Sequence, residues 1–509
     1  MSGTTGERPI RVRMAPSPTG ALHIGTARTS LYNFLFARHF GGTYVLRIED
    51  TDVVRSTKEF ERDIIEGLHW LGIRWDEGPA AGSEAGDGNE IGAHGPYRQS
   101  ERLDRYRREA DRLLEAGLAY RCYCTPEELE AVRHEQERNR QAPRYNGRCR
   151  NLTADERAAF EREGRRGAIR FATPAETVRW DDLVRGEVEF DNGLLGDIVI
   201  VRADGSPLYN FTAVIDDAAM EISHVIRGED HISNTPKQIA LYRALGLEPP
   251  RFGHIPLILN PDRTKMSKRK AETSMSVYRD EGYLPEAMVN FLAFLGWSPG
   301  TEEEIFSLPQ LADRFEIEKV HKAGAVFDRD RLNYLNGLYI RSLTDGQLAE
   351  RLRPFLPDGA EPSTVEGLVP LVRERLVRLG DVTELAGFLF QTDVDVAAQY
   401  DAELLYPKGR GAAEAGAALL AARRELDSLT DADWSAEGLE ARFRAAAEAM
   451  GWKAGDLFKP MRVAITGRTV SPPLFGSMLL LGQSRCIARI DAALAKLPGV
   501  EAGVGEPAR

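Results

Sequence analysis

A strand, a tight turn and a helix open this chain, and this unit constrains the fold more than any other segment. Residues 10–15 alternate as a short strand does, residues 16–20 are Pro-Ser-Pro-Thr-Gly, and an amphipathic stretch follows over residues 26–40. A loop of this kind directs backbone N–H groups and the positive end of a helix at an anion. We therefore predict a phosphate site here, with His23 as a hydrogen-bond donor to a phosphate oxygen.

A basic segment far downstream is the second distinctive feature. It consists of Lys265-Met266-Ser267-Lys268-Arg269 and follows the turn-forming residues 260–262. This composition predicts a mobile loop whose cations suit a transient negative charge. Each segment alone also fits a bland structure, either a plain βα connection or a solvated surface loop, but the two together are far more specific.

Composition limits the class of protein. With 509 residues we expect about two to four domains, each with its own core. No apolar run is long enough to cross a bilayer, and residues 1–9 lack the apolar core of a secretory signal, so we expect no membrane partner. The four cysteines do not describe a disulfide framework, which indicates a reducing, cytoplasmic location.

The charge balance bears on nucleic acid as a partner. A net charge of −12 argues against it at first, because phosphates are neutralised by lysine and arginine. The chain nevertheless holds 66 basic residues, which is ample for one positive face. We therefore expect a patchy nucleic-acid binder.

Periodicity places the remaining elements. The predicted strands are residues 44–48, 167–171, 188–190, 197–202, 225–227 and 256–259. The predicted helices are residues 57–71 with Ser56 or Thr57 as the cap, 100–116, 126–139 with Pro126 in the first turn, and 235–245. From Pro285 to Leu497 the pattern is helical, and the Gly-rich residues 80–95 are expected to be a surface loop without assigned chemistry.

The two motifs together resemble the signatures H-I-G-H and K-M-S-K-S of class I aminoacyl-tRNA synthetases. Here they are His23-Ile24-Gly25-Thr26 and Lys265–Arg269, and the departures Thr26 and Arg269 are similar to variants of the glutamyl-tRNA synthetase branch. Residues 13–20, 46–52, 209–217 and 225–230 also look like the glutamate-specific members. The chain thus resembles the bacterial-type glutamyl-tRNA synthetases over nearly its whole length.

The resemblance implies an α/β fold. A Rossmann-like parallel-sheet catalytic domain carries an α+β insertion and is followed by an all-helical anticodon-binding region. The implied boundaries are 10–112 for the first half of the catalytic domain, 113–207 for the acceptor-binding insertion, 208–263 for the second half, 264–340 for the mobile-loop and stem-contact region, 341–497 for the anticodon-binding region, and 1–9 and 498–509 for flexible tails.

The implied reaction is the activation of L-glutamate by ATP with Mg²⁺ and its transfer to tRNA(Glu). On the resemblance, the catalytic residues are His23, Lys265 and Lys268, and the nucleotide-binding residues are Gly20, His23, Gly25, Thr26, Lys265, Ser267 and Lys268. Glutamate would be bound by Arg13, Ser17, Glu49, Tyr209 and Arg227. The residue types agree with this, because a carboxylate suits the ammonium group and guanidinium or hydroxyl donors suit the two carboxylates.

A cysteine cluster in the insertion is a candidate zinc site. Cys122, Cys124 and Cys149 are soft ligands, and Tyr145 is the fourth donor by resemblance to a shorter paralogue with the same Tyr-x-x-x-Cys spacing. Asn151 stands where some family members have a histidine. Reduced structural thiols are the open alternative, and isolated Cys486 is expected in the core.

Arginines in the helical region are candidates for reading the anticodon. Arg373 and Arg375 lie in a cluster that would otherwise be a solvated helix face, and the resemblance places Arg375 at a position that discriminates the third anticodon base. We expect a cytoplasmic monomer. The alternatives are a catalytically silent tRNA- or ATP-binding module and an enzyme that also charges tRNA(Gln).

Overall fold

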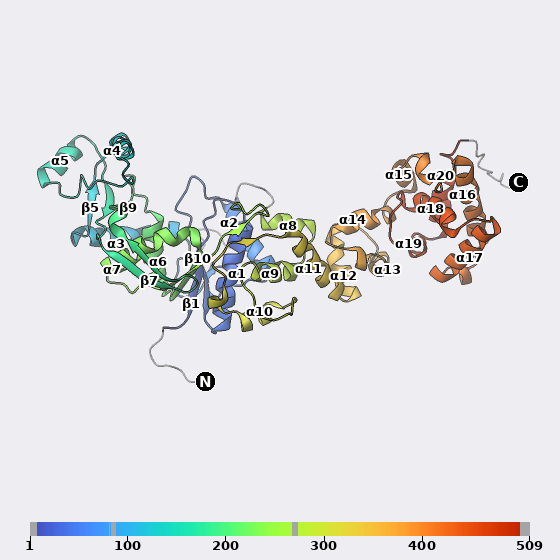
Figure 1. Ribbon diagram of the computed structural model, residues 1–509, viewed down its shortest axis with the longest axis horizontal. Helices are drawn as coiled ribbons and strands as arrows, with labels where there is room; N and C mark the ends of the chain where they lie inside the picture. The colour runs from blue at the N-terminus through green and yellow to red at the C-terminus, as the bar shows by residue number, and fades with distance from the viewer. Residues whose placement is uncertain (1–7, 81, 83–87, 267–272, 499–509) are drawn as a thin grey trace. The chain divides into compact units, whose positions relative to one another are not determined.

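The computed structural model describes residues 8–80, 82, 88–266 and 273–498 (Figure 1). The chain forms two compact units. The first runs up to Arg279 and resumes over Pro285–Leu332, and the second comprises Asp280–Leu284 and the described chain from Asn333 onward. In these ranges no helix combines the length and the apolar character needed to cross a membrane.

A four-stranded parallel sheet is the centre of the first unit. Its order is β11-β10-β1-β2, with bounds Arg251–Ile255, His224–Gly228, Arg11–Met14 and Thr43–Leu46. The chain leaves β1 for β2 on one side, while the later strands β10 and β11 lie on the other. Parallel sheets bind ligands outside the carboxyl ends of the strands at such a reversal. The candidate site is therefore expected where β1 and β10 end.

The helix after the first motif covers this sheet. α1 (Ile24–His39) packs on β1, β2 and β10 and also on α9 (Pro285–Ala293) and α10 (Leu308–Arg314). It begins two residues earlier than predicted because the His23 side chain is itself the N-cap. α2 (Lys58–Trp70) is capped by Thr57, as predicted, whose hydroxyl accepts from the Phe60 N–H.

The insertion is α+β, as predicted. Its antiparallel sheet has the order β5-β6-β9, with bounds Ala119–Cys122, Ala168–Phe171 and Ile198–Val201, and a hairpin joins β7 (Thr177–Asp182) to β8 (Gly186–Asp191). α4 (Pro126–Arg138) and α5 (Ala154–Arg162) each begin with a capping box, and Pro126 stands in the first turn as predicted.

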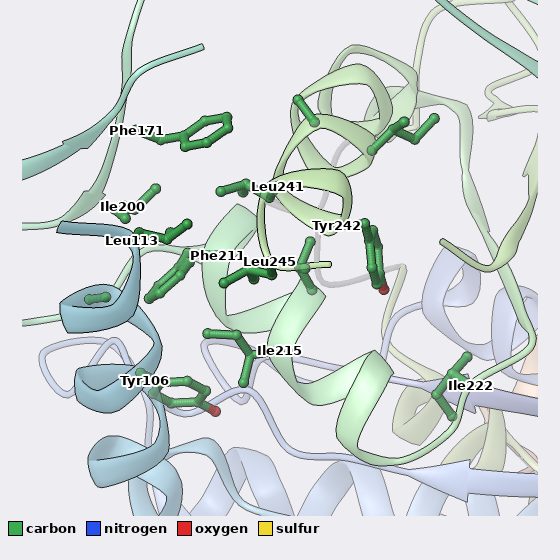
Figure 2. Close-up of a cluster of buried hydrophobic side chains, with 14 of the residues drawn as sticks. Tyr106, Leu113, Phe171, Ile200, Phe211, Ile215, Ile222, Leu241, Tyr242 and Leu245 are labelled. Carbon is green, nitrogen blue, oxygen red and sulfur yellow. The ribbon is translucent and has the colours of Figure 1, made fainter. Parts of the chain in front are cut away.

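One hydrophobic core joins the insertion to the helices beside the sheet (Figure 2). α3 (Leu103–Glu115) contributes Tyr106 and Leu113, the insertion contributes Phe171 and Ile200, and α6 (Tyr209–Ala219) and α7 (Thr235–Ala244) pack between them. Burial of apolar area on this scale holds the insertion firmly against the catalytic sheet.

Several elements differ from the sequence prediction. The strand predicted at 256–259 is wrong in its bounds, because the sheet strand is β11 and Pro256, which has no N–H, ends it; β12 (Ile258–Leu259) pairs instead with β13 (Ala325–Val326). Helix α6 and strand β7 were not predicted as elements, and the helix at 100–116 begins with the 3₁₀ turn Gln99–Arg102.

The remaining elements are mostly helical. In and around the first unit they are β3 (Gly78–Pro79), β4 (Glu90–Ile91), α8 (Met275–Glu281) and α11 (Arg329–Ser342). The second unit holds α12 (Asp345–Leu352), α13 (Pro362–Val372), α14 (Asp381–Ala386), α15 (Asp393–Ala398), α16 (Ala412–Asp427), α17 (Ala436–Ala449), α18 (Ala454–Thr466), α19 (Leu474–Leu481) and α20 (Gln483–Leu494). The helical pattern predicted from Pro285 onward is thus confirmed, apart from the short strand β13.

A buried asparagine ties the segment Asp280–Leu284 into the second unit. The Asn336 Oδ1 accepts from the Leu284 N–H at 2.8 Å, and its Nδ2 donates to the Val377 carbonyl at 2.6 Å. Nearby, Gly282 has a φ of +88°, and a Cβ there would lie 2.4 Å from the Gly380 nitrogen. Only glycine allows the two backbones to approach this closely.

We expect Asn336→Ala to lower the free energy of unfolding of the second unit by about 2–4 kcal/mol, because it leaves a buried N–H and a partly buried carbonyl without partners. Calorimetry of the full chain should show that the transition of the second unit occurs at a lower temperature in the variant than in wild type. The exposed Asn151→Ala is the control. Equal melting curves for the two variants would contradict the role assigned to Asn336.

Candidate active site

A buried carboxylate joins two arginines at the carboxyl ends of the strands. The Asp217 Oδ1 accepts from the Arg13 Nε at 3.0 Å and from the Arg47 Nη1 at 2.7 Å. Burial opposes the ionisation of Asp217, but the two guanidinium groups lower its pKa. The Arg13 Nε is the only guanidinium nitrogen of that residue with a protein acceptor among the described residues, so its two Nη groups are available to a ligand.

Glu49 lies on the other side of Arg47. Its Oε1 accepts from the Arg47 Nη2 at 3.0 Å, and its backbone N–H donates to the Pro16 carbonyl at 2.9 Å. Burial raises the pKa of Glu49, and the charges of Arg47 and Arg13 oppose this rise. The structure thus brings predicted residues Arg13 and Glu49 together through Arg47, which the sequence prediction did not single out.

Arg227 and Tyr209, both predicted, also meet. Arg227 is the penultimate residue of β10. Its Nη1 lies 3.4 Å from the Tyr209 hydroxyl, and His231 Nδ1 lies 3.2 Å from that hydroxyl. Among the described residues no carboxylate is within ion-pair distance of Arg227, although Arg227 is only 5% exposed and lies in the electrostatic field of Arg13. Burial and Arg227 lower the pKa of His231 to about 4, so this imidazole is neutral at pH 7.

The first loop leaves room for a ligand. Nothing lies within 4 Å of a Cβ built on Gly20, and the Ser17 side chain is exposed. Gly25 also contacts His23, because a Cβ there would lie 3.2 Å from the His23 ring. Glycine at this position lets the imidazole pack over the start of α1.

His23 is held by the first turn of its helix. Its Nδ1 accepts from the Thr26 N–H at 3.3 Å, and its Nε2 lies 2.8 Å from the Thr26 hydroxyl. Since Nδ1 is an acceptor, the neutral ring carries its proton on Nε2. Thr26, one of the two departures from the general motif, therefore orients His23.

The second motif is described only in part. Ser267, Lys268 and Arg269 lie outside the described residues. Lys265 pairs with Leu259 in an isolated bridge, its side chain is 60% exposed, and its Nζ is 3.7 Å from an Asp230 oxygen.

Beyond that gap the chain returns to the first motif. Ser274 forms an isolated antiparallel bridge with His23, and the Met275 N–H donates to the Leu22 carbonyl at 2.8 Å. Backbone pairing therefore places Ser274 and Met275, which follow the second motif in the sequence, against the first motif.

A second buried carboxylate, Asp216, stabilises the network around Arg47 and was not predicted. It accepts from the Arg102 Nε at 2.6 Å, the Tyr106 hydroxyl at 2.7 Å and the Gln99 Nε2 at 2.8 Å. The Arg47 Nε lies 3.8 Å away. These partners come from the start of α3, so the network that holds Arg47 extends to the element that leads into the insertion. The only signal of this network in the sequence was the pair of consecutive acids, Asp216 and Asp217, in a helix with an apolar face.

The three predicted cysteine ligands lie together in the insertion. The sulfur atoms of Cys122, Cys124 and Cys149 are all within 4.8 Å of one another, and two of them, those of Cys124 and Cys149, are 3.6 Å apart. The Tyr145 hydroxyl is 3.4 Å from Cys122 Sγ and 3.8 Å from Cys124 Sγ. Cys486 is fully buried elsewhere, as predicted.

The two predicted arginines of the second unit are placed differently. Arg373 donates to the Arg341 and Leu343 carbonyls and pairs with Asp345, so it secures the end of α11. Arg375 is exposed and donates from Nη1 to the Ser471 carbonyl at 2.9 Å.

Arg462 converges on the same turn as Arg375. It donates to the Ser471 hydroxyl at 2.6 Å, and burial together with the charge of Arg375 lowers its pKa. Within the described chain no carboxylate forms an ion pair with either of these two arginines. An anion is therefore the natural ligand for this surface.

Two family models match the chain. Residues 9–334 match the catalytic domain of class I tRNA synthetases (E and Q), and residues 347–494 match an anticodon binding domain. Together they span both compact units.

Curated relatives and solved structures agree with these models. The chain is 46% identical to a glutamate–tRNA ligase of Moorella thermoacetica, over 95% of this chain and 98% of the relative, and 44% identical to one of Desulforudis audaxviator, over 96% of each. A crystal structure of a glutamate tRNA ligase from Elizabethkingia meningosepticum in complex with its amino acid is 32% identical, with a TM-score of 0.79 over 96% of this chain and 100% of that one.

We expect Asp216→Asn to lower the free energy of unfolding by about 3–5 kcal/mol, because it leaves the buried Arg102 without its anionic partner. Guanidinium unfolding of the full chain measures the change. The exposed Asp204→Asn, which makes the same substitution in a surface turn, is the control. A loss no larger than that of the control would remove Asp216 from the supporting network.

Proposed function

The chain belongs to the class I tRNA synthetases for glutamate and glutamine, and from this premise we propose that it is a glutamate–tRNA ligase whose amino-acid site is the cluster around Asp217. The observation that carries the proposal is the juxtaposition of two arginines, one glutamate and one tyrosine at the carboxyl ends of β1, β2 and β10. Glutamate carries two carboxylates and one ammonium, and these groups match the cluster.

Binding positions the substrate for attack. Arg13, Arg227 and the Tyr209 hydroxyl bind the two carboxylates of glutamate, and Glu49 accepts from its ammonium group. The Nη groups of Arg13 support this role, because Asp217 uses only the Nε, and so does the absence of an ion pair at Arg227 among the described residues. Exposed Ser17 is assigned to the same pocket from the family resemblance.

Activation joins glutamate to ATP, which enters as its magnesium complex. An α-carboxylate oxygen attacks the α-phosphorus, and the bond to the pyrophosphate oxygen breaks, so the products are glutamyl-adenylate and pyrophosphate. The start of α1 favours the negative charge that develops, and the open surface at Gly20 admits the nucleotide. His23, whose Nε2–H points at the Thr26 hydroxyl, is assigned to the phosphates from the family resemblance. Lys265, whose side chain is 60% exposed, is assigned to the charge of the departing pyrophosphate.

Transfer then completes the reaction. A hydroxyl of the terminal ribose of tRNA attacks the carbonyl carbon of the mixed anhydride, the carbonyl–phosphate bond breaks, and AMP leaves as the hydroxyl loses its proton. The insertion, which packs on the catalytic helices through one core, is assigned to the acceptor end. The helical second unit is assigned to the anticodon, in agreement with its family model.

Arg375 is the stronger of the two anticodon candidates. Its guanidinium is exposed beside Arg462, whereas the guanidinium of Arg373 is occupied by two backbone carbonyls and Asp345. We assign Arg375 to base or phosphate contact and Arg373 to the support of the same surface. A cytoplasmic monomer remains part of the proposal, by the family resemblance alone.

Zinc in the insertion is the proposed metal. The donor set fits, because tetrahedral zinc with Zn–S bonds of about 2.3 Å separates its sulfur ligands by about 3.8 Å, and the Cys124 and Cys149 sulfurs lie 3.6 Å apart. Cys122, Cys124, Cys149 and Tyr145 would hold the ion. Bound zinc would supply a rigid cross-link between β5 and the segment 145–149, with no part in the chemistry.

The zinc proposal predicts about one zinc ion per purified chain. Cys124→Ser should lower the zinc content severalfold, because it removes one soft ligand, and Cys486→Ala should retain it, because that thiol lies outside the cluster. Elemental analysis by mass spectrometry gives both numbers. Full-length protein that stays free of zinc after refolding with excess metal would contradict the assignment.

The amino-acid site predicts a selective effect for Arg13→Gln. The KM for glutamate should rise about 100-fold, since a charged hydrogen-bonding partner of a carboxylate is worth roughly 2–5 kcal/mol, while the KM for ATP changes little. The assay is tRNA-dependent pyrophosphate exchange with saturating tRNA, and the exposed Arg55→Gln is the control. A rise confined to ATP would take Arg13 out of the amino-acid pocket.

A further inference from the structure

A carboxylate of the insertion reaches the strand beside Arg227. Asp182 ends β7, is 2% exposed, and lies next to β11, where the Leu183 N–H donates to the Phe252 carbonyl at 2.9 Å. The partner of Asp182 is His254 of β11, and His254 in turn stands opposite Arg227 in the register of β10 and β11. Three side chains from three strands thus form a line that ends at the amino-acid site.

The two oxygens of Asp182 have separate tasks. Oδ1 accepts from three backbone N–H groups, those of Val184 at 3.1 Å, Arg185 at 3.0 Å and His254 at 3.1 Å. Oδ2 lies 2.5 Å from the His254 Nδ1. Although burial opposes ionisation, the hydrogen bonds from the His254 ring and from the His254 and Arg185 backbone N–H groups lower the pKa of Asp182. An ionised carboxylate only accepts, so Nδ1 of His254 must carry the proton.

The other ring nitrogen of His254 faces Arg227. The Arg227 Nε donates to Nε2 at 3.2 Å, and the Thr235 hydroxyl lies 3.0 Å from the same nitrogen. A guanidinium only donates, so Nε2 must be bare. The contacts at both ends of the imidazole therefore require the same neutral tautomer. Burial and the charge of Arg227 also lower the pKa of His254.

In this arrangement no carboxylate among the described residues forms an ion pair with Arg227. Its other contacts are the neutral groups of Gln238 at 2.9 Å, Thr235 at 2.7 Å and Tyr209 at 3.4 Å. Asp182 is held one imidazole ring away, whereas Asp217 touches Arg13 directly. Through the His254 ring, Asp182 fixes the orientation of Arg227. Asp182 itself forms no ion pair with Arg227 that would compete with a substrate carboxylate.

We propose that Asp182 is a positioning residue that acts through His254 to fix the direction of Arg227, so that the insertion contributes to amino-acid selection. This inference rests on the proposed function, in which Arg227 binds a carboxylate of glutamate. The insertion then has two tasks, because the same β7–β8 hairpin that belongs to the tRNA-binding part also completes the glutamate pocket.

The variant Asp182→Asn separates this proposal from a purely structural role for Asp182. Its Oδ1 alone stabilises the turn after β7, and Asp182→Asn retains that oxygen because three backbone N–H groups select it. The amide nitrogen must then replace Oδ2 and donate to the His254 Nδ1. The ring proton moves to Nε2, where it opposes the Arg227 Nε–H. The turn is thus preserved while the contact with Arg227 is reversed.

The first test is kinetic. Wild type, Asp182→Asn and Asp181→Asn are compared in tRNA-dependent pyrophosphate exchange; Asp181 is the adjacent, exposed acid and serves as the matched control. We expect a 10- to 100-fold higher KM for glutamate in Asp182→Asn, a KM for ATP within about threefold of wild type, and wild-type values for Asp181→Asn. An unchanged KM for glutamate, or a fall in kcat alone, would overturn the proposal.

The second test does not use activity. Nitrogen-15 NMR of histidine-labelled protein reports the tautomer of each ring, and His254→Gln identifies the signals of His254. We expect the Nδ1–H form in wild type and the Nε2–H form in Asp182→Asn. The Nε2–H form in wild type would overturn the proposal even if Asp182→Asn fails to fold. A wild-type protein with the expected tautomer but no glutamate activation would instead contradict the proposed function.

Discussion

The buried ion-pair network at Asp217 is the interaction on which the site depends. Arg13 lies in β1, Arg47 follows β2 and Asp217 lies in α6, so a single carboxylate fixes groups from two neighbouring strands. Burying these charges is costly unless each is paired and hydrogen-bonded. In this network the hydrogen-bond donors are already oriented before a substrate binds. Such preorganised donors are the condition for electrostatic stabilisation of a transition state.

The rest of the first unit maintains this arrangement. Asp216 holds Arg102 and Tyr106 of the α3 region, and the hydrophobic core around Phe211 and Leu241 joins the same helices to the insertion (Figure 2). The insertion is consequently continuous with the amino-acid site in both its apolar and its polar contacts. A change in the insertion has a short physical route to the proposed amino-acid site, through β7 and β11.

Local chemistry explains which features the sequence could predict. The Pro/Gly turn, the cap at Thr57, the first-turn Pro126 and the cysteine spacing act over a few residues, and the structure has all four where the sequence predicted them. Family resemblance supplied Arg13, Glu49, Tyr209 and Arg227. The interactions that connect these residues were missed. Arg47, Asp216 and His254 pair with residues far away in the sequence, and a single sequence carries no signal for such pairing. The strand wrongly placed at 256–259 was an apolar run whose proline ends the ladder instead of joining it.

The central claim is that this pocket selects a second carboxylate, and selectivity against glutamine tests it most directly. Glutamine has nearly the shape of glutamate but offers N–H donors where the arginines also donate. The measurement is the ratio of kcat/KM for glutamate over glutamine in the charging of purified tRNA(Glu) by the full-length protein. A site built on hydrogen bonds to a carboxylate predicts a ratio of about 10⁴ or more. A ratio within tenfold of unity would contradict the account.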